Sequence, residues 1–365
     1  MSPLAPPPLL RLERTALAAA GLGAVAAVVL AWLSPSAFAP AYRFAAFACL
    51  APATGSLIFT LILRMTGGQW GPALQPFFSA GIALLPWIWL LTIPILFFPH
   101  NGMARLASPP EKADLFASHG MLVARAAFYG LVFFAVAGGV AHLLKIRRRG
   151  DVTSLRWVAP ASLITLVLML HVLADDWLIN LEPHWHSTAF PAVWMAGMTL
   201  AGYATALFCA ILHGADPNAI GPAKRPFGID WGNLLLVSMV FWCYVAFAQF
   251  LIIWAENLPH ENSWYLHRSH GGWLVIIVLL ALFHFAVPFV FLLSRRVKRL
   301  PSGLARLALL LLGAQFLYLA WMILPAFGPT TPVSLGLAIA LFAAGAGLCF
   351  NRYLAHARRH REAAA

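Results

Sequence analysis

Ten apolar runs, each about the length of a membrane-spanning helix, constrain the fold of this chain more than any other feature. A helix that crosses the hydrocarbon core of a bilayer needs about 20 mostly apolar residues. The connections between the runs are short and leave no room for a separate soluble domain. The sequence therefore predicts an all-α polytopic membrane protein with about ten transmembrane helices. The expected spans are 15–33, 42–63, 73–98, 119–144, 158–178, 188–212, 231–255, 272–294, 304–325 and 332–354.

The scarcity of charged side chains supports a membrane fold. Of the 365 residues, 61% are hydrophobic and 10% are charged, whereas a soluble domain has about 25% charged residues. A surface with so few charges must face lipid rather than water. The four cysteines lie in apolar runs without CxxC spacing, so the sequence predicts no zinc ribbon, iron–sulfur site or covalent haem attachment.

Lysine and arginine are distributed unequally over the alternating connections. Nineteen lie on the side that holds both chain ends, and four lie on the other side: Arg43, Arg105, Lys112 and Arg268. An excess of basic residues marks the cytoplasmic side of a membrane protein. Both termini are therefore predicted to be cytoplasmic, in the inner (plasma) membrane of a bacterium. This sorting explains the net charge of +12 without a nucleic acid partner.

The sequence predicts one transmembrane domain at 15–354 with a tail at each end. Residues 1–14 are proline-rich and are expected to form a disordered cytoplasmic tail, and residues 355–365 a basic one. The Ala37-Phe38-Ala39 sequence resembles a signal-peptide cleavage site, but the apolar run before it is longer than a usual signal core. This length favours a retained first helix.

Arg125 lies about six residues inside the fourth predicted span. Its long side chain can reach the lipid headgroups by snorkelling, or it can face a polar cavity and pair with an acid or a quinone carbonyl. Tyr129 follows four residues later and shares its helix face.

The fifth predicted span ends in a histidine and two acids. His171 and Asp175 are four residues apart and share one helix face, with Asp176 beside them. The carboxylates either cap the helix in the headgroup zone or exchange protons at the mouth of a relay. Glu182 and His184 follow in the next connection, where His184 and His186 form a His-x-His pair without a third ligand. The sequence therefore predicts no metal site.

His284 lies within the eighth predicted span and is either a core histidine or part of a polar path from the cytoplasm. Two b-type haems would require spans that carry two histidines about 13 residues apart. None of the predicted spans has such a pair, so no intrinsic haem is predicted.

The stretch QFLIIWAENLPHENSWYLHRSHGGW, residues 249–273, contains more polar and aromatic residues than a short connection needs. Gln249 lies two helical turns before Glu256 on the same face. A glutamine inside a span usually hydrogen-bonds another helix. Glu256 is either a solvated acid at the membrane boundary or a proton exit. Pro259 is expected to turn the chain toward the eighth span.

Three segments resemble a known family. FAQFLIIWAENLPHENSWYLHRSHGGW, LADDWLINLEPHWHSTAF and HGMLVARAAFYG look like motifs of the ActF subunit of alternative complex III, a bacterial quinol:electron-acceptor oxidoreductase. This subunit belongs to the NrfD/PsrC-like superfamily. The resemblance implies two four-helix bundles, helices 2–5 and 6–9, flanked by helices 1 and 10. It also implies a quinol-oxidising paralogue, an iron–sulfur protein and c-type cytochromes as partners.

The residues that match the family motifs include Arg125 and Asp176. The connection before helix 6 and the connection between helices 7 and 8 add Glu182, His184, Gln249, Trp254, Asn257, Pro259, Trp264, Tyr265 and Arg268. The chain departs from the pattern at His260, which replaces an acid, and at His186, which replaces an aromatic residue. Both lie on the predicted outer face, where the family contacts its partners, so a stand-alone homologue is an alternative.

The predicted function is a membrane subunit of a respiratory quinol oxidoreductase that contributes a quinol-facing or proton-conducting path. Electrons would pass to iron–sulfur and cytochrome partners, and quinol is the expected bound molecule. The alternatives are a stand-alone proton channel or transporter without electron transfer, and a structural anchor for partners. Arg125, His171, Asp175 and Asp176 are expected to form the polar end of one cleft. The full set of path candidates is Arg125, Tyr129, His171, Asp175, Asp176, Glu182, His184, Gln249, Glu256 and His284.

Overall fold

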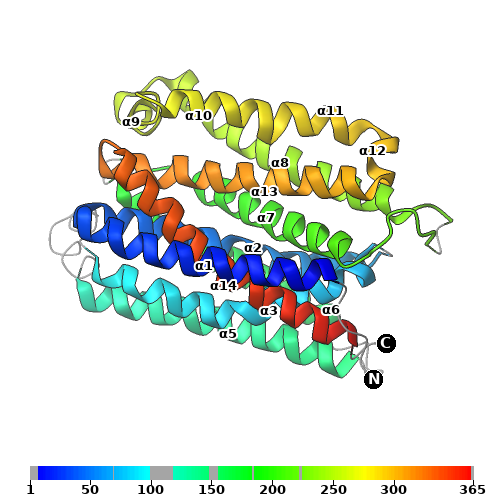
Figure 1. Ribbon diagram of the computed structural model, residues 1–365. Helices are drawn as coiled ribbons and strands as arrows, with labels where there is room; N and C mark the ends of the chain where they lie inside the picture. Colours follow the sequence, from blue (N-terminus) through cyan, green and yellow to red (C-terminus); the bar gives the residue numbers. More distant parts are fainter. Residues whose placement is uncertain are drawn as a thin grey trace.

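The structure is a computed structural model that describes residues 7–68, 70–98, 118–147, 155–182, 185–221 and 224–362. Within these ranges, ten helices are long and apolar enough to cross a membrane, each with a counterpart among the predicted spans. The helices lie side by side, and both chain ends lie at one end of the molecule (Figure 1). The predicted all-α polytopic membrane fold is confirmed.

The first bundle contains four consecutive spans. They are α2 (Phe38–Thr66), α3 (Gly71–Thr92), α5 (His119–Arg147) and α6 (Leu155–Trp177). Helix α2 packs on α3, α3 on α5, α5 on α6, and α6 again on α2, so the four helices close a ring. The third span continues beyond α3 as the 3₁₀-helix η2 (Ile93–Phe97).

The second bundle repeats this arrangement. Its helices are α7 (Phe190–Leu212), α8 (Phe227–Glu256), an eighth span in three parts, and α13 (Pro301–Ile323). The eighth span consists of α10 (Trp273–Leu280), the π-helix η5 (Ala281–Ala286) and α11 (Val287–Leu293). Helix α7 packs on α8 and α13, α8 packs on α11 and η5, and α10 packs on α13.

Helices α1 (Pro7–Leu33) and α14 (Pro332–Glu362) form a pair outside the two bundles, and α14 packs on α2 and α3. The two bundles with two flanking helices agree with the predicted architecture. Both flanking helices extend into the predicted tails, because residues 7–14 and 355–362 are helical. Residues 1–6 and 363–365 lie outside the described residues.

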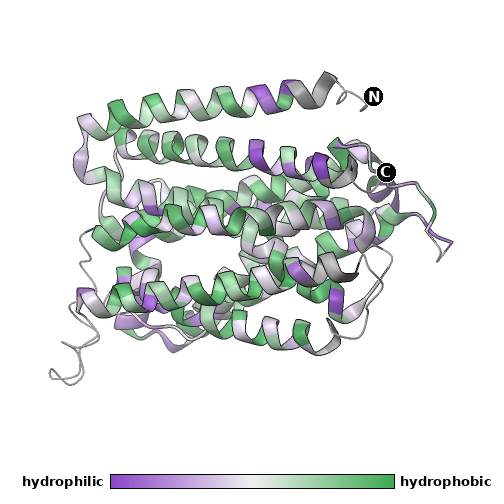
Figure 2. Cartoon of the chain, turned by 90° about the horizontal axis from the view of Figure 1, so that it is seen from below, coloured by the Kyte–Doolittle hydropathy of each residue, from purple (hydrophilic) through white to green (hydrophobic). Residues whose placement is uncertain are grey.

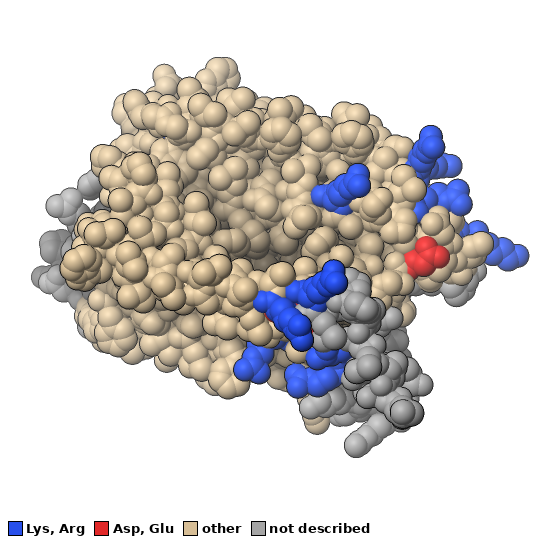
Figure 3. Space-filling view, in the orientation of Figure 1, with Lys and Arg blue, Asp and Glu red and all other residues tan. Residues whose placement is uncertain are grey.

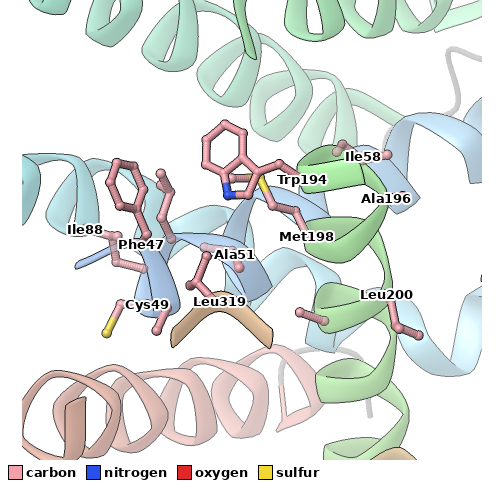
Figure 4. Packing of buried hydrophobic residues seen from close by; sticks show 14 of the residues in the cluster. Phe47, Cys49, Ala51, Ile58, Ile88, Trp194, Ala196, Met198, Leu200 and Leu319 are labelled. Carbon is pink, nitrogen blue, oxygen red and sulfur yellow. The ribbon is translucent and has the colours of Figure 1, made fainter. Parts of the chain in front are cut away.

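The bundles meet where α2 packs against α7. Gly55 of α2 lies against the backbone of Met198 and Gly202 in α7, so closely that a methyl group on Gly55 or Gly202 would overlap the facing backbone. Small residues allow this close approach of membrane helices. One to two turns away, Phe47 of α2 and Trp194 of α7 make an edge-to-face contact with ring centroids 5.8 Å apart (Figure 4).

The π-helix η5 precedes Pro288, the second residue of α11. Proline has no backbone N–H and its ring crowds the carbonyl four residues earlier, which here belongs to His284. A π-helical turn absorbs this disruption without breaking the span.

Connections at one end of the molecule include η1 (Pro35–Ala37), η4 (Ile179–Leu181), α9 (Pro259–His267) and η6 (Leu324–Phe327). We call this the Glu256 end. The opposite end, called the Lys298 end, holds α12 (Arg295–Arg299) and both chain ends. On the face shown in Figure 3, lysine and arginine side chains gather toward the Lys298 end. Hydrophilic residues concentrate toward the two ends of the helices (Figure 2).

Helix α9 was not predicted as a helix. Asn257 ends α8 in a left-handed conformation with φ 51°, and Pro259 begins α9 rather than a simple turn. Asparagine tolerates this conformation, and proline suits the first position of a helix because its missing N–H is not needed there. The polar stretch therefore folds as a short helix across the Glu256 end.

Candidate functional site: a cleft at the Glu256 end

A cleft of about 520 Å³ opens at the Glu256 end between the first and second bundles. This volume falls within the roughly 300–1,000 Å³ of small-molecule sites. Its walls are the end of α6, η4, the segment 186–189, the end of α8 and part of α9. The titratable and amide side chains in its lining are His171, Asp175, Asn180, His186, Gln249, Glu256 and Glu261.

Four of the predicted path residues meet in this cleft. His171 and Asp175 come from α6, with His171 Nε2 3.9 Å from Asp175 Oδ2, and their side chains are 43% and 49% exposed. Gln249 and Glu256 come from α8, and Gln249 is buried. The two pairs are more than 70 positions apart in the chain, so only the fold shows that they share a site.

His186 and Glu261 line the same cleft, although neither was among the predicted path residues. The sequence contained a signal for each. His186 closes the His-x-His pair, and Glu261 is the acid that remains in the motif beginning at Pro259. Both lie in connections, where periodicity gives no information about the direction of a side chain.

Asp176 does not line the cleft. Its Oδ2 accepts a hydrogen bond from Arg125 Nε at 2.7 Å and another from the hydroxyl of Tyr129. Asp176 and Tyr129 are buried, and the Arg125 side chain is 15% exposed. These three side chains join α5 to α6 inside the first bundle.

The neighbouring aspartates therefore have different surroundings. Successive residues of an α-helix point about 100° apart, so Asp175 faces the cleft while Asp176 faces α5. This arrangement differs from the predicted single cleft formed by Arg125, His171, Asp175 and Asp176. His171 and Asp175 are in the cleft, and Arg125 and Asp176 form a separate ion pair.

Glu182 also lies outside the cleft, in a buried ion pair with Arg268. Arg268 Nη1 donates to Glu182 Oε1 at 2.5 Å and to the carbonyl of Trp264 at 2.8 Å. Its Nε and Nη2 donate to the carbonyls of Trp321 and Met322 at 3.1 and 2.7 Å. The guanidinium thus joins the connection after α6, α9 and the end of α13.

Burial lowers the pKa of Arg268, and the Glu182 carboxylate opposes this shift. Arginine stays protonated because its ordinary pKa is so high. The guanidinium also lies over the Trp264 ring, with Cζ 3.8 Å from the ring centroid. His267 Nδ1 lies 3.3 Å from the second oxygen of Glu182 and is exposed to solvent.

An aromatic stack connects this ion pair to the cleft. The rings of Trp185 and Trp264 stack with centroids 5.0 Å apart, and Trp321 meets Trp264 edge-on at 5.2 Å. Trp185 Nε1 donates to the backbone carbonyl of Glu261 at 3.0 Å. Because Glu261 lines the cleft, the buried ion pair and the stack together position one of its walls.

The remaining residues of the predicted outer-loop motif shape α9. Asn257 Oδ1 accepts a hydrogen bond from Asn262 Nδ2 at 2.8 Å, next to Pro259 at the start of the helix. Tyr265 packs edge-on against Trp264, and burial raises its pKa. Trp254 is 65% exposed on α8 and points away from the bundle. His184 lies outside the described residues.

His284 lies away from the cleft, inside the second bundle. It is fully buried, and neither ring nitrogen has a hydrogen-bond partner among the residues that the structure describes. Its ring centroid is 3.8 Å from that of Trp242 on α8 and 6.4 Å from that of Tyr318 on α13. Trp242 lies seven residues before Gln249, so the α8 face that lines the cleft continues inward to His284.

Within the described ranges, no group of three or more histidine, cysteine, aspartate or glutamate side chains has the geometry of a metal site. Comparison of the whole chain with known proteins finds no matching family model and no matching curated protein. Membership of the ActF-like family therefore stays a prediction from three sequence motifs.

Proposed function

We propose that this protein is a membrane subunit of a quinol:electron-acceptor oxidoreductase and that its cleft receives the head group of a quinol. The observation that carries the proposal is the convergence of His171, Asp175, Gln249 and Glu256 in one cleft at the end of a membrane bundle. The proposed setting is a bacterial inner membrane with both termini in the cytoplasm. The Glu256 end then faces outward.

The position of the cleft suits a ligand that arrives from lipid. Ile252 lines the cleft and is 54% exposed on α8, and its neighbour Leu251 is 44% exposed. These side chains lie on a span whose surface is apolar and mostly unburied. A quinol that diffuses within the membrane can therefore reach the cleft sideways, and Ile179 and Ile253 offer apolar contacts for its ring.

Oxidation of a quinol releases two protons and two electrons. In the proposed reaction, the Asp175–His171 pair and Glu256 accept the protons from the two hydroxyl groups, because carboxylates and imidazoles act as general bases. The Gln249 amide hydrogen-bonds one ring oxygen and orients the head group. Electrons pass to iron–sulfur and c-type cytochrome partners, as the family resemblance implies.

The two buried ion pairs support the cleft without contacting the quinol. Arg125–Asp176 holds the end of α6 against α5, and Arg268–Glu182 holds α9 against the end of α13. Side chains that bind ligands need rigid support from the surrounding structure. We assign both pairs this positioning role.

Binding of a short-chain quinol to the purified protein in lipid nanodiscs tests the proposal. We expect Gln249→Leu and Glu256→Gln each to weaken binding by about tenfold, because the first removes the amide proposed to hydrogen-bond a ring oxygen and the second replaces the carboxylate proposed to accept a proton. Asp216→Asn is the matched control, since Asp216 is an exposed acid at the Lys298 end. Quenching of tryptophan fluorescence measures the affinity.

Equal affinity in wild type, Gln249→Leu and Glu256→Gln would contradict the assignment of the cleft. Co-purification tests whether the protein is a subunit of a larger oxidoreductase complex. A quinol oxidoreductase subunit should be isolated with iron–sulfur and multihaem cytochrome proteins, and their reduction by quinol should slow in the Glu256→Gln variant.

One observation favours the alternative of a proton-conducting protein. His284 is an ionisable group buried in a span, and no described residue hydrogen-bonds to its ring; such groups often mark proton paths. A stand-alone channel or transporter would move protons across liposomes when purified alone. Proton flux that His284→Leu abolishes, from a preparation without redox partners, would favour this second function.

A further inference from the structure

Arg43 is a buried cation to which the proposed function gives no role. It lies five residues after the start of α2, at the Glu256 end, and is 1% exposed. None of the described residues accepts a hydrogen bond from its Nη1 or Nη2. The guanidinium instead contacts the Phe327 ring, whose centroid is 5.3 Å from Cζ. A buried guanidinium without an acceptor is costly, because its donors have lost water.

Arg268, which is also buried at the Glu256 end, provides a comparison for the hydrogen bonding of Arg43. It is equally buried, but it donates hydrogen bonds to one carboxylate and three backbone carbonyls. Both residues also contact an aromatic ring. The difference between them is that the described residues provide hydrogen-bond acceptors for Arg268 but none for the Nη1 and Nη2 atoms of Arg43. An acceptor from outside the chain would complete the surroundings of Arg43.

A small cleft lies beside Arg43. It has a volume of about 160 Å³ and lies between the α1–α2 connection and the α13–α14 connection. Phe327, whose ring contacts Arg43, lines this cleft, as does Ala41, two residues before Arg43. Phe327 is only partly buried. The hydroxyl-bearing residues of the lining are Ser34, Ser36, Thr330, Thr331 and Ser334.

The start of α14 adds a favourable field for an anion. Thr331 and Ser334 cap this helix: the Ser334 N–H donates to Thr331 Oγ1 at 3.1 Å, and the Thr331 N–H donates to Ser334 Oγ at 2.9 Å. The amino-terminal end of a helix attracts negative charge. The cleft therefore combines hydroxyl donors, a helix amino terminus and a nearby unpaired guanidinium.

We propose that this cleft binds a phosphate group, with Arg43 as its buried counter-charge. Arginine matches phosphate oxygens with two parallel donors, and the serine and threonine hydroxyls supply further donors. Contact with Arg43 requires the Phe327 ring to turn aside. The cleft is smaller than the usual site for a quinone-sized molecule, so a compact anionic group fits better. The phosphate comes from a phospholipid headgroup or from inorganic phosphate in the water.

Thermal unfolding of the full chain in a neutral detergent, combined with native mass spectrometry, tests this site. Phosphatidylglycerol, diacylglycerol and inorganic phosphate are added separately to delipidated protein. We expect phosphatidylglycerol to raise the unfolding temperature and to give a bound-lipid mass, and diacylglycerol, which lacks phosphate, to do neither. A rise with inorganic phosphate alone would also support the site and would identify the water as a source.

The variant Arg43→Gln should lose the phosphate-dependent rise. Arg306→Gln is the matched control, because Arg306 is exposed on α13 and forms no ion pair with any described residue. If Arg43→Gln fails to fold, the double variant Ser36→Ala, Thr330→Ala should weaken phosphatidylglycerol binding several-fold. The same rise in wild type and Arg43→Gln, or no rise in wild type with either phosphate source, would overturn the proposal.

Discussion

Asp176 accepts hydrogen bonds from Arg125 and Tyr129, while Asp175, the next residue toward the amino terminus, faces the cleft. The two aspartates are adjacent near the end of α6, so their sequence context did not separate them. The separation depends on which helix packs against each face of α6. We therefore propose that Asp176 stabilises the packing of α6 on α5 and that Asp175 accepts protons in the cleft.

This assignment predicts different effects of two conservative substitutions. Asp176→Asn should lower the free energy of unfolding by about 2–3 kcal/mol, because it removes the carboxylate that accepts the Arg125 and Tyr129 hydrogen bonds in a mostly buried position. Asp175→Asn should change it by less than about 0.5 kcal/mol, because its side chain is 49% exposed. Denaturant unfolding of the two variants in detergent measures both values. Similar losses in both would show that the two acids share one structural role.

Arg268 and Glu182 show why a single sequence did not reveal the second ion pair. They are 86 positions apart, and each lies in a connection between spans. The resemblance to the ActF-like motifs selected both residues but contained no information that they contact one another. Glu182 was expected on a quinone or proton path. In the structure its carboxylate forms a buried ion pair with Arg268.

At the scale of helices, the sequence predicted the spans well because a membrane imposes one requirement on each. Every run of about 20 apolar residues has a counterpart in the structure, with ends that differ by several residues. Helix α9 was missed because its residues, PHENSWYLH, have no apolar periodicity. It is instead held by Trp264 and Arg268, whose contacts come from distant parts of the chain.

The close contact between α2 and α7 depends on glycines in both helices, because only residues without a side chain fit between the two backbones. Gly55→Ala should lower the unfolding temperature, because the added methyl group would overlap the Met198 backbone and force the two bundles apart. Overpacking of this kind costs about 1–3 kcal/mol, and more where backbone must move.

Gly21→Ala is the control for this prediction. Gly21 is also in a membrane helix, α1, but nothing lies within 4 Å of an added methyl group. Alanine favours helix formation over glycine by up to about 1 kcal/mol, so this variant should be as stable as wild type or slightly more stable. Equal unfolding temperatures for Gly55→Ala and wild type would show that the contact between α2 and α7 has more space than the structure indicates.

At the scale of the whole molecule, the two bundles place their proposed sites at one end and most of their basic residues at the other. The proposed quinol cleft lies between α6 and α8, and the proposed phosphate cleft lies beside η1 and η6. Arginine and lysine side chains gather toward the Lys298 end (Figure 3), where both chain ends also lie (Figure 1). The positive-inside rule then predicts that the Lys298 end faces the cytoplasm and that both clefts open at the outer leaflet.

Labelling of single introduced cysteines in intact bacterial cells tests this orientation. Ser269 and Ser302 are both exposed, Ser269 between α9 and α10 at the Glu256 end and Ser302 at the start of α13 at the Lys298 end. A maleimide that cannot cross the inner membrane should label Ser269→Cys in intact cells and Ser302→Cys only after the cells are broken. The four native cysteines are replaced by serine or alanine first, so that the maleimide reacts only with the introduced thiol. Labelling of Ser302→Cys in intact cells would reverse the orientation, and quinol would then have to reach the cleft from the cytoplasmic leaflet.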